Sequence, residues 1–106
     1  MKRGCGLTVA VWVALVGAYA AVRRGDFETM VRLVPRRSLT LMQERSDDLP
    51  LWQSMRPRAP ALVSGWMTDE AATLTVRGAT PKGEQTVAYH LEKSADGWRI
   101  RREWFP

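Results

Sequence analysis

The sequence predicts an α+β fold in which an apolar N-terminal membrane or signal helix and short helices precede a four-stranded antiparallel meander sheet. Three observations predict it. Residues 4–22 are uncharged, residues 26–55 carry apolar side chains at helical spacing, and after residue 61 that spacing changes to two. With 106 residues, 45% of them hydrophobic and 25% charged, the chain has room for one small domain. Separate cofactor and substrate lobes are therefore excluded.

The first segment indicates export or attachment to a membrane. Basic residues stand on both sides of residues 4–22, a stretch that contains no acid, amide or proline. About 20 apolar residues span the hydrocarbon core of a bilayer, so the stretch comes close to the required length. We expect residues 1–24 to be an apolar anchor or signal segment that continues into the first helix, and residues 25–106 to form the small domain.

Two interpretations of this segment remain open. A retained anchor would hold the domain at a bacterial inner membrane, on its periplasmic or extracellular side, with residues 4–22 in the lipid. A signal peptide would instead be cleaved after the small-x-small site Ala18-Tyr19-Ala20, and the domain would be secreted.

Three short helices are expected after the apolar segment. Gly25–Asp26 should end the apolar helix and cap the first short helix, which covers residues 27–34. The second short helix is expected over residues 38–44. The third should follow a cap at Asp47–Asp48 and carry Pro50 in its first turn.

Four strands should follow a proline-rich connector at residues 56–60. They are expected at residues 61–68, 72–79, 84–93 and 97–105. If the last two turns close so that the apolar residues of neighbouring strands share one face, Val76 pairs with Val87 and Leu91 pairs with Ile100. One face of the sheet is then apolar and meets the helices, while the other is polar. The predicted polar face carries Thr75, Arg77, Thr86, His90, Glu92, Arg99 and Arg101. The orientation of Trp66 and Met67 stays open.

Two short motifs resemble the nuclear transport factor 2-like superfamily. Residues 18–28, AYAAVRRGDFE, resemble the first helix and Gly-Asp break of those proteins, and residues 94–100, SADGWRI, are similar to their D-G-x-W-x-I end strand. The resemblance implies a cone-like fold, closest to small exported members similar to lumazine-binding or SnoaL-like domains. It also implies that the helix ending at Gly25 belongs to the fold, which favours a retained anchor over cleavage near Ala20.

The charge pattern argues against a nucleic-acid partner. Sixteen basic and eleven acidic residues give a formal charge of +5, and the basic residues are scattered among the acids without forming a run. The single cysteine, Cys5, excludes an internal disulfide and a thiolate zinc cluster.

No catalytic site is expected. His90 is the only histidine, and the register places it on the polar face beside Arg101, with no second residue placed to orient it. In enzymes of the superfamily that the chain resembles, a His–Asp pair transfers the proton, and here the acids that could serve, Asp69 and Asp96, lie in turns. We expect no enzyme activity, no metal and no cofactor.

Two functions stay open. The first is a non-catalytic, membrane-attached module outside the cytoplasm that binds a protein partner or a second copy of itself. Its contact residues would be Arg99, Arg101, Trp104 and Phe105. The second is a small-molecule carrier or small pocket enzyme with a cavity between the helices and the apolar sheet face. Its lining would be Tyr89, Arg102 and Trp52. Arg102 falls on the helix-facing side in the predicted register, where it would bind a carboxylate or phosphate.

Overall fold

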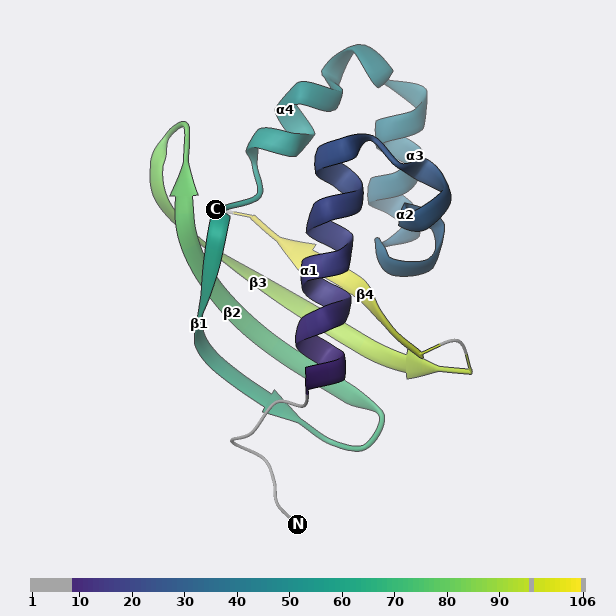
Figure 1. The fold of residues 1–106 in the computed structure, drawn as a ribbon, viewed down its shortest axis with the longest axis vertical. Helices are drawn as coiled ribbons and strands as arrows, with labels where there is room; N and C mark the ends of the chain where they lie inside the picture. Colours follow the sequence, from purple (N-terminus) through teal and green to yellow (C-terminus); the bar gives the residue numbers. More distant parts are fainter. Residues whose placement is uncertain (1–8, 96, 106) are drawn as a thin grey trace.

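The computed structural model describes residues 9–95 and 97–105, which form helices on one face of an antiparallel sheet (Figure 1). The helices are α1 (Val9–Arg24), α2 (Phe27–Leu33), α3 (Arg36–Glu44) and α4 (Leu49–Ser54), with a 3-10 turn, η1 (Ser46–Asp48), before α4. The strands are β1 (Arg58–Met67), β2 (Ala71–Thr80), β3 (Gly83–Ser94) and β4 (Gly97–Trp104). They lie in the order β1-β2-β3-β4. The α+β fold, with helices first and a four-stranded meander after them, is confirmed.

One side of α1 packs onto the sheet and forms the middle of the core. Its buried residues recur at helical spacing: Val11, Leu15, Ala18, Tyr19 and Val22. From the sheet they meet Leu74, Val76, Val87, Tyr89, Leu91 and Ile100, which are all at most 1% exposed. Although the chain is short, a single curved sheet covers this side of the apolar helix (Figure 1).

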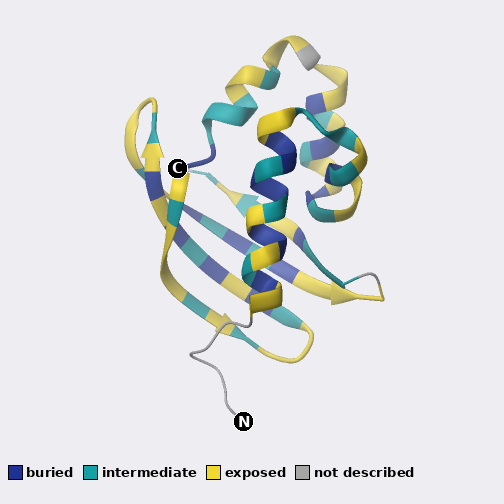
Figure 2. Cartoon of the chain, in the orientation of Figure 1, coloured by how far each residue is buried: buried dark blue, intermediate teal, exposed yellow. Residues whose placement is uncertain are grey.

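The other side of α1 is apolar and open to solvent. Val9, Val13 and Val16 are 78%, 59% and 45% exposed, and Figure 2 shows exposed and buried positions alternating along the helix. Among the described residues, no helix has the length and hydropathy needed to cross a bilayer. Residues 4–8 of the predicted membrane segment, with Cys5, lie outside the described residues.

The helix break after α1 forms as its residues predict. Gly25 takes a φ of 68°, the left-handed conformation that ends helices. Asp26 then caps α2, since its carboxylate accepts from the Thr29 amide at 3.2 Å and from the Thr29 hydroxyl at 2.7 Å. Asp48 stands at the corresponding position before α4, but its side chain accepts no capping hydrogen bond.

The expected connector at residues 56–60 is partly strand. β1 begins at Arg58, and its pairing with β2 is irregular between Arg58 and Ala61. Pro60 is tolerated there because β1 is an edge strand. The two strands come unusually close at Gly78, where a Cβ would lie 2.5 Å from the carbonyl oxygen of Arg58.

The predicted register holds for both hairpins near their turns. Val76 lies opposite Val87, and Leu91 lies opposite Ile100. Further along β4 the register shifts, so that His90 faces Arg102 and not Arg101. The predictions that Arg101 faces His90 and that Arg102 points inward are therefore wrong.

This irregularity decides which side chains enter the core. A β-bulge adds one residue to a strand and reverses the sides of all residues beyond it. Arg102 is consequently exposed on the outer face, and Glu103 turns inward opposite Tyr89. At the other edge of the sheet, Met67 packs against the core and Trp66 is 55% exposed.

Candidate functional site

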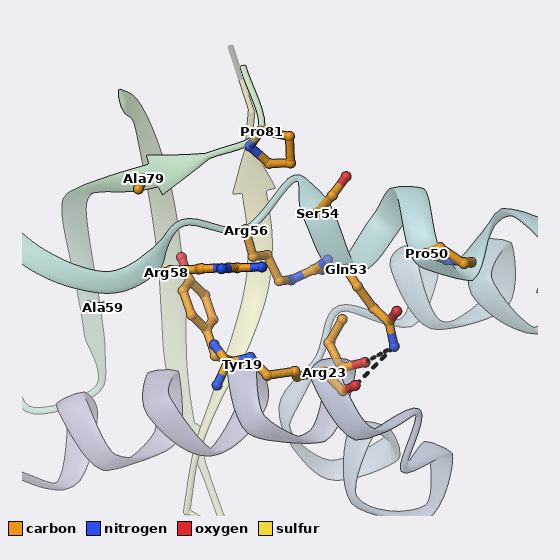
Figure 3. A pocket seen from close by; sticks show the side chains of 11 residues that line it. Tyr19, Arg23, Pro50, Gln53, Ser54, Arg56, Arg58, Ala59, Ala79 and Pro81 are labelled. Carbon is orange, nitrogen blue, oxygen red and sulfur yellow. Dashed lines mark hydrogen bonds between the residues drawn. The ribbon is translucent and has the colours of Figure 1, made fainter. Parts of the chain in front are cut away.

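A cavity of about 560 Å³ lies where α1, α4 and the paired ends of β1 and β2 meet (Figure 3). Its polar lining is dominated by three arginines: Arg23 at the end of α1, Arg56 before β1, and Arg58 in β1. None of the described residues that line the cavity carries a carboxylate. Within the described residues, neither Arg23 nor Arg58 forms an ion pair. In Figure 3 the side chains of Arg23 and Arg58 extend toward the Tyr19 ring. We call this the arginine cavity.

Arg56 is the buried part of this lining, and an acid from β4 neutralises it. Its Nη2 donates to Glu103 Oε1 at 2.6 Å, and the two side chains are only 4% and 2% exposed. Ser38 donates its hydroxyl to the same oxygen at 3.0 Å. Arg56 also donates to the carbonyl of Trp52 and lies 5.3 Å from the centre of the Phe105 ring. These contacts hold one guanidinium in a fixed position, with its charge balanced.

Two tyrosines form a buried hydrogen-bonded pair beside Arg56. The hydroxyls of Tyr19 and Tyr89 are 2.5 Å apart, and their rings meet edge to face with centroids 5.9 Å apart. Burial raises the pKa of Tyr19 to about 12, although the bond to Tyr89 opposes part of this rise. Burial, followed by the neighbouring Tyr19, raises the pKa of Tyr89 as well. Both groups are neutral phenols near pH 7, so neither can serve there as a base.

Gln53 joins α4 to the end of α1 at the wall of the cavity. Its Nε2 donates to the carbonyl oxygens of Val22 and Arg23, each at 3.0 Å. Carbonyls in the last turn of a helix have no partner within the helix, so a side-chain donor satisfies them. The bond fixes the backbone from which the Arg23 side chain enters the cavity.

The three residues predicted to line a ligand pocket do not meet in this cavity. Tyr89 is fully buried behind Tyr19, and Arg102 lies on the outer face of the sheet. Trp52 is half-buried against the core and contributes its carbonyl to Arg56. The sequence interpretation missed Arg23, Arg58 and Glu103. Arg23 carried a signal, a basic residue at the end of an apolar helix, but that signal also fits the edge of a membrane segment.

The predicted interface residues of β4 also separate. Arg101 and Trp104 are exposed on the outer face. Arg99 instead reaches α2 and donates to the Val34 carbonyl at 2.8 Å, and burial, with Arg101 nearby, lowers its pKa. Phe105 packs against the core.

His90 lies on the outer face of the sheet, away from the arginine cavity. Its Nε2 is 3.2 Å from Glu92 Oε2, and Glu92 Oε1 accepts from Arg101 Nε at 3.2 Å. In the described part of the chain, no three His, Cys, Asp or Glu side chains gather closely enough to hold a metal ion.

No protein-family model, curated protein or solved structure matches the chain.

Proposed function

We propose that the chain is a non-catalytic binding domain whose arginine cavity takes a small organic anion. The observation that carries this proposal is the pair Arg23 and Arg58, two guanidinium groups that share a cavity to which no described residue contributes a carboxylate. Guanidinium groups bind carboxylates and phosphates through two parallel hydrogen bonds. A ligand with such a group relieves the repulsion between the two arginines.

The rest of the lining favours a ligand with an apolar body. Val22, Pro50, Ala79 and Pro81 bring carbon surface to the cavity, and its 560 Å³ lies within the range of small-molecule sites. The ligand class is therefore a carboxylate or phosphate ester joined to an apolar group.

Binding is favoured over catalysis because none of the described lining residues offers a group that exchanges protons near pH 7. Guanidinium groups donate hydrogen bonds but do not act as bases in proteins. The phenol of the lining, Tyr19, has a pKa of about 12. The sole histidine lies on the opposite side of the sheet.

The test is the melting temperature of the full chain with phenyl phosphate, benzoate or the neutral isostere benzamide, at constant ionic strength. We expect both anions to raise the melting temperature and benzamide to leave it unchanged, because binding to the native state stabilises it. The Arg23→Gln and Arg58→Gln variants should lose most of this gain.

Arg24→Gln is the matched control, since Arg24 is adjacent in sequence and 64% exposed but does not line the cavity. It should respond to the anions like the unaltered chain. Equal stabilisation by benzamide, or an unchanged response in Arg23→Gln and Arg58→Gln, would contradict the proposal.

A membrane-attached module outside the cytoplasm is our second candidate, and the open side of α1 favours it. Val9, Val13 and Val16 form an uncharged stripe that can enter the lipid interface while the opposite side stays on the sheet. We expect the full chain to sediment with lipid vesicles, and Val13→Ser with Val16→Ser to reduce the bound fraction. Equal sedimentation of this double variant would rule out the stripe as the contact.

The nuclear transport factor 2-like, cone-like fold also remains a proposal. It is supported by the Gly25–Asp26 break between α1 and α2 and by the packing of α1 on the sheet. An experimental structure with α1 detached from the sheet would contradict it.

A further inference from the structure

A second hollow, of about 480 Å³, lies on the outer face of the sheet. It is lined by His90 and Glu92 from β3 and by Arg101, Arg102 and Trp104 from β4. We call it the outer hollow. The sheet lies between it and the arginine cavity, so the two sites share no residue.

The β4 bulge builds this hollow. In a regular strand, consecutive residues point to opposite faces, but here Arg101 and Arg102 are both exposed on the outer face. Beyond them Trp104 returns to the same face, opposite the small side chain of Ala88. Bulges re-aim side chains and are over-represented next to functional sites. The result is two cations and a large ring beside a low part of the sheet.

The polar groups of the hollow differ in how far they are engaged. Arg101 is tied to Glu92, whose other oxygen meets His90. His90 Nδ1 lies 3.5 Å from the hydroxyl of Thr73 on β2. Arg102 has no ion-pair partner among the described residues. Arg102 is thus the cation left for a ligand, and the Glu92 carboxylate keeps acceptor sites beyond those its two neighbours use.

Trp104 supplies an apolar surface at the rim. Trp104 is 48% exposed although its side chain is large and apolar. An exposed indole ring offers a flat face to C–H groups, and its neighbours here are donors and acceptors. A planar apolar face beside a free guanidinium and a carboxylate fits a ligand that is ring-shaped, hydroxylated and acidic.

We propose that the outer hollow binds a sugar acid of the uronic type. Arg102 holds the carboxylate, the C–H face of the pyranose ring lies on Trp104, and Glu92 and His90 accept from or donate to ring hydroxyls. The ligand can be a free sugar acid or one unit of an acidic polysaccharide, since both present the same chemistry.

The test follows the indole N–H signals of the ¹⁵N-labelled full chain during titration with D-galacturonate. D-glucose, which lacks the charge, and acetate, which lacks the ring, are the comparison ligands. The Trp104 signal is assigned through Trp104→Phe, and we expect galacturonate to shift it. The comparison ligands should shift it at least about tenfold less at equal concentration, because each lacks one of the two contacts. Trigalacturonate binding more tightly than the monomer indicates a polymer as the natural source, and equal affinity indicates a free sugar acid.

Variants separate this site from the arginine cavity. Arg102→Gln and Trp104→Ala should each weaken galacturonate binding about tenfold or more. Trp66→Ala, which removes the exposed indole at the other edge of the sheet, and Arg23→Gln, which alters the arginine cavity, should leave it unchanged. Equal shifts with acetate, unchanged binding in Arg102→Gln, or tighter binding of a hexaglutamate peptide than of trigalacturonate would each overturn the proposal.

Discussion

Arg56 and Glu103 form an ion pair in which Nη2 and Oε1 are 2.6 Å apart and both side chains are almost completely buried. Arg56 lies two residues before β1 and Glu103 lies near the end of β4, so the pair joins segments from the two edge strands of the sheet. Ser38 of α3 donates to the same carboxylate. One buried acid therefore connects α3, the start of β1 and the end of β4, and it fixes the Arg56 side of the arginine cavity.

Glu103→Gln should lower the free energy of unfolding by about 3–5 kcal/mol, because it leaves the buried Arg56 charge unpaired. Glu84→Gln is the control, since it removes a 2.7 Å ion pair with Arg77 in which both side chains are more than half exposed. Its effect should be under about 1 kcal/mol. Urea unfolding measures both. The double variant Arg56→Met with Glu103→Leu should recover most of the loss, and a Glu103→Gln loss no larger than that of Glu84→Gln would refute the coupling.

Spectrophotometric titration reports on the buried tyrosine pair, because Tyr19 and Tyr89 are the chain's two tyrosines. Burial moves the Tyr19 pKa from 10.0 to about 12 and raises that of Tyr89. The stabilisation from neutral phenols is therefore complete below pH 10 and declines as the pH rises from 10 toward 12. We expect little phenolate absorbance from the native protein at pH 10.5 and a clear signal at that pH in urea. Half-ionisation of the native protein near pH 10 is the opposing result.

Substitutions on the two sides of α1 should have very different effects. Leu15→Ala removes a side chain that is fully buried against the sheet, so the free energy of unfolding should fall by about 2–5 kcal/mol. Val13→Ala alters the exposed side and should change the free energy by no more than about 0.5 kcal/mol. Denaturant unfolding compares them. Similar small effects of the two substitutions would mean that α1 does not pack on the sheet.

Gly78→Ala should disturb both stability and ligand binding. Its Cβ would lie 2.5 Å from the Arg58 carbonyl oxygen and 2.8 Å from Pro57 Cβ, so the strand carrying Arg58 must shift, at a cost of about 1–3 kcal/mol. Phenyl phosphate should then stabilise the variant less than the unaltered chain. Gly17→Ala is the comparison, because its Cβ would meet only the flexible end of Leu33 at 3.2 Å. Thermal melts in which Gly78→Ala matches the unaltered chain would show that the close approach is absent.

The strands and the register near each turn could be predicted from the sequence because one face of the sheet is buried. A slip of one residue would expose Val76, Val87 and Leu91 together, so the apolar pattern allows a single pairing there. Turn chemistry at Gly83 and Gly97, both with positive φ, points to the same register.

The same reasoning failed at Arg102 and Glu103 because polarity gives no preference between them. Either register buries one charged side chain of β4. The choice depends on which side chain finds a buried partner of opposite charge. That partner is Arg56, which lies 47 residues from Glu103 in the sequence. The arginine cavity was missed for a related reason, since its arginines come from α1, the segment before β1 and β1 itself.

The apolar segment was ambiguous in a different way. High hydropathy indicates that a helix is buried away from water. It does not indicate whether lipid or a sheet covers the helix. In the structure the sheet covers Val11, Leu15 and Val22, while Val9 and Val13 stay open. Sequence periodicity could not separate these two sides because no polar residue marks the boundary.

The most direct test of the central claim is a map of amide and arginine Nε–H shifts in the ¹⁵N-labelled full chain during titration with phenyl phosphate. We predict that the largest shifts fall on Arg23, Gln53, Ser54 and Arg58, which line the arginine cavity. Saturable shifts confined to other surfaces, or no saturable shifts at all, would contradict it.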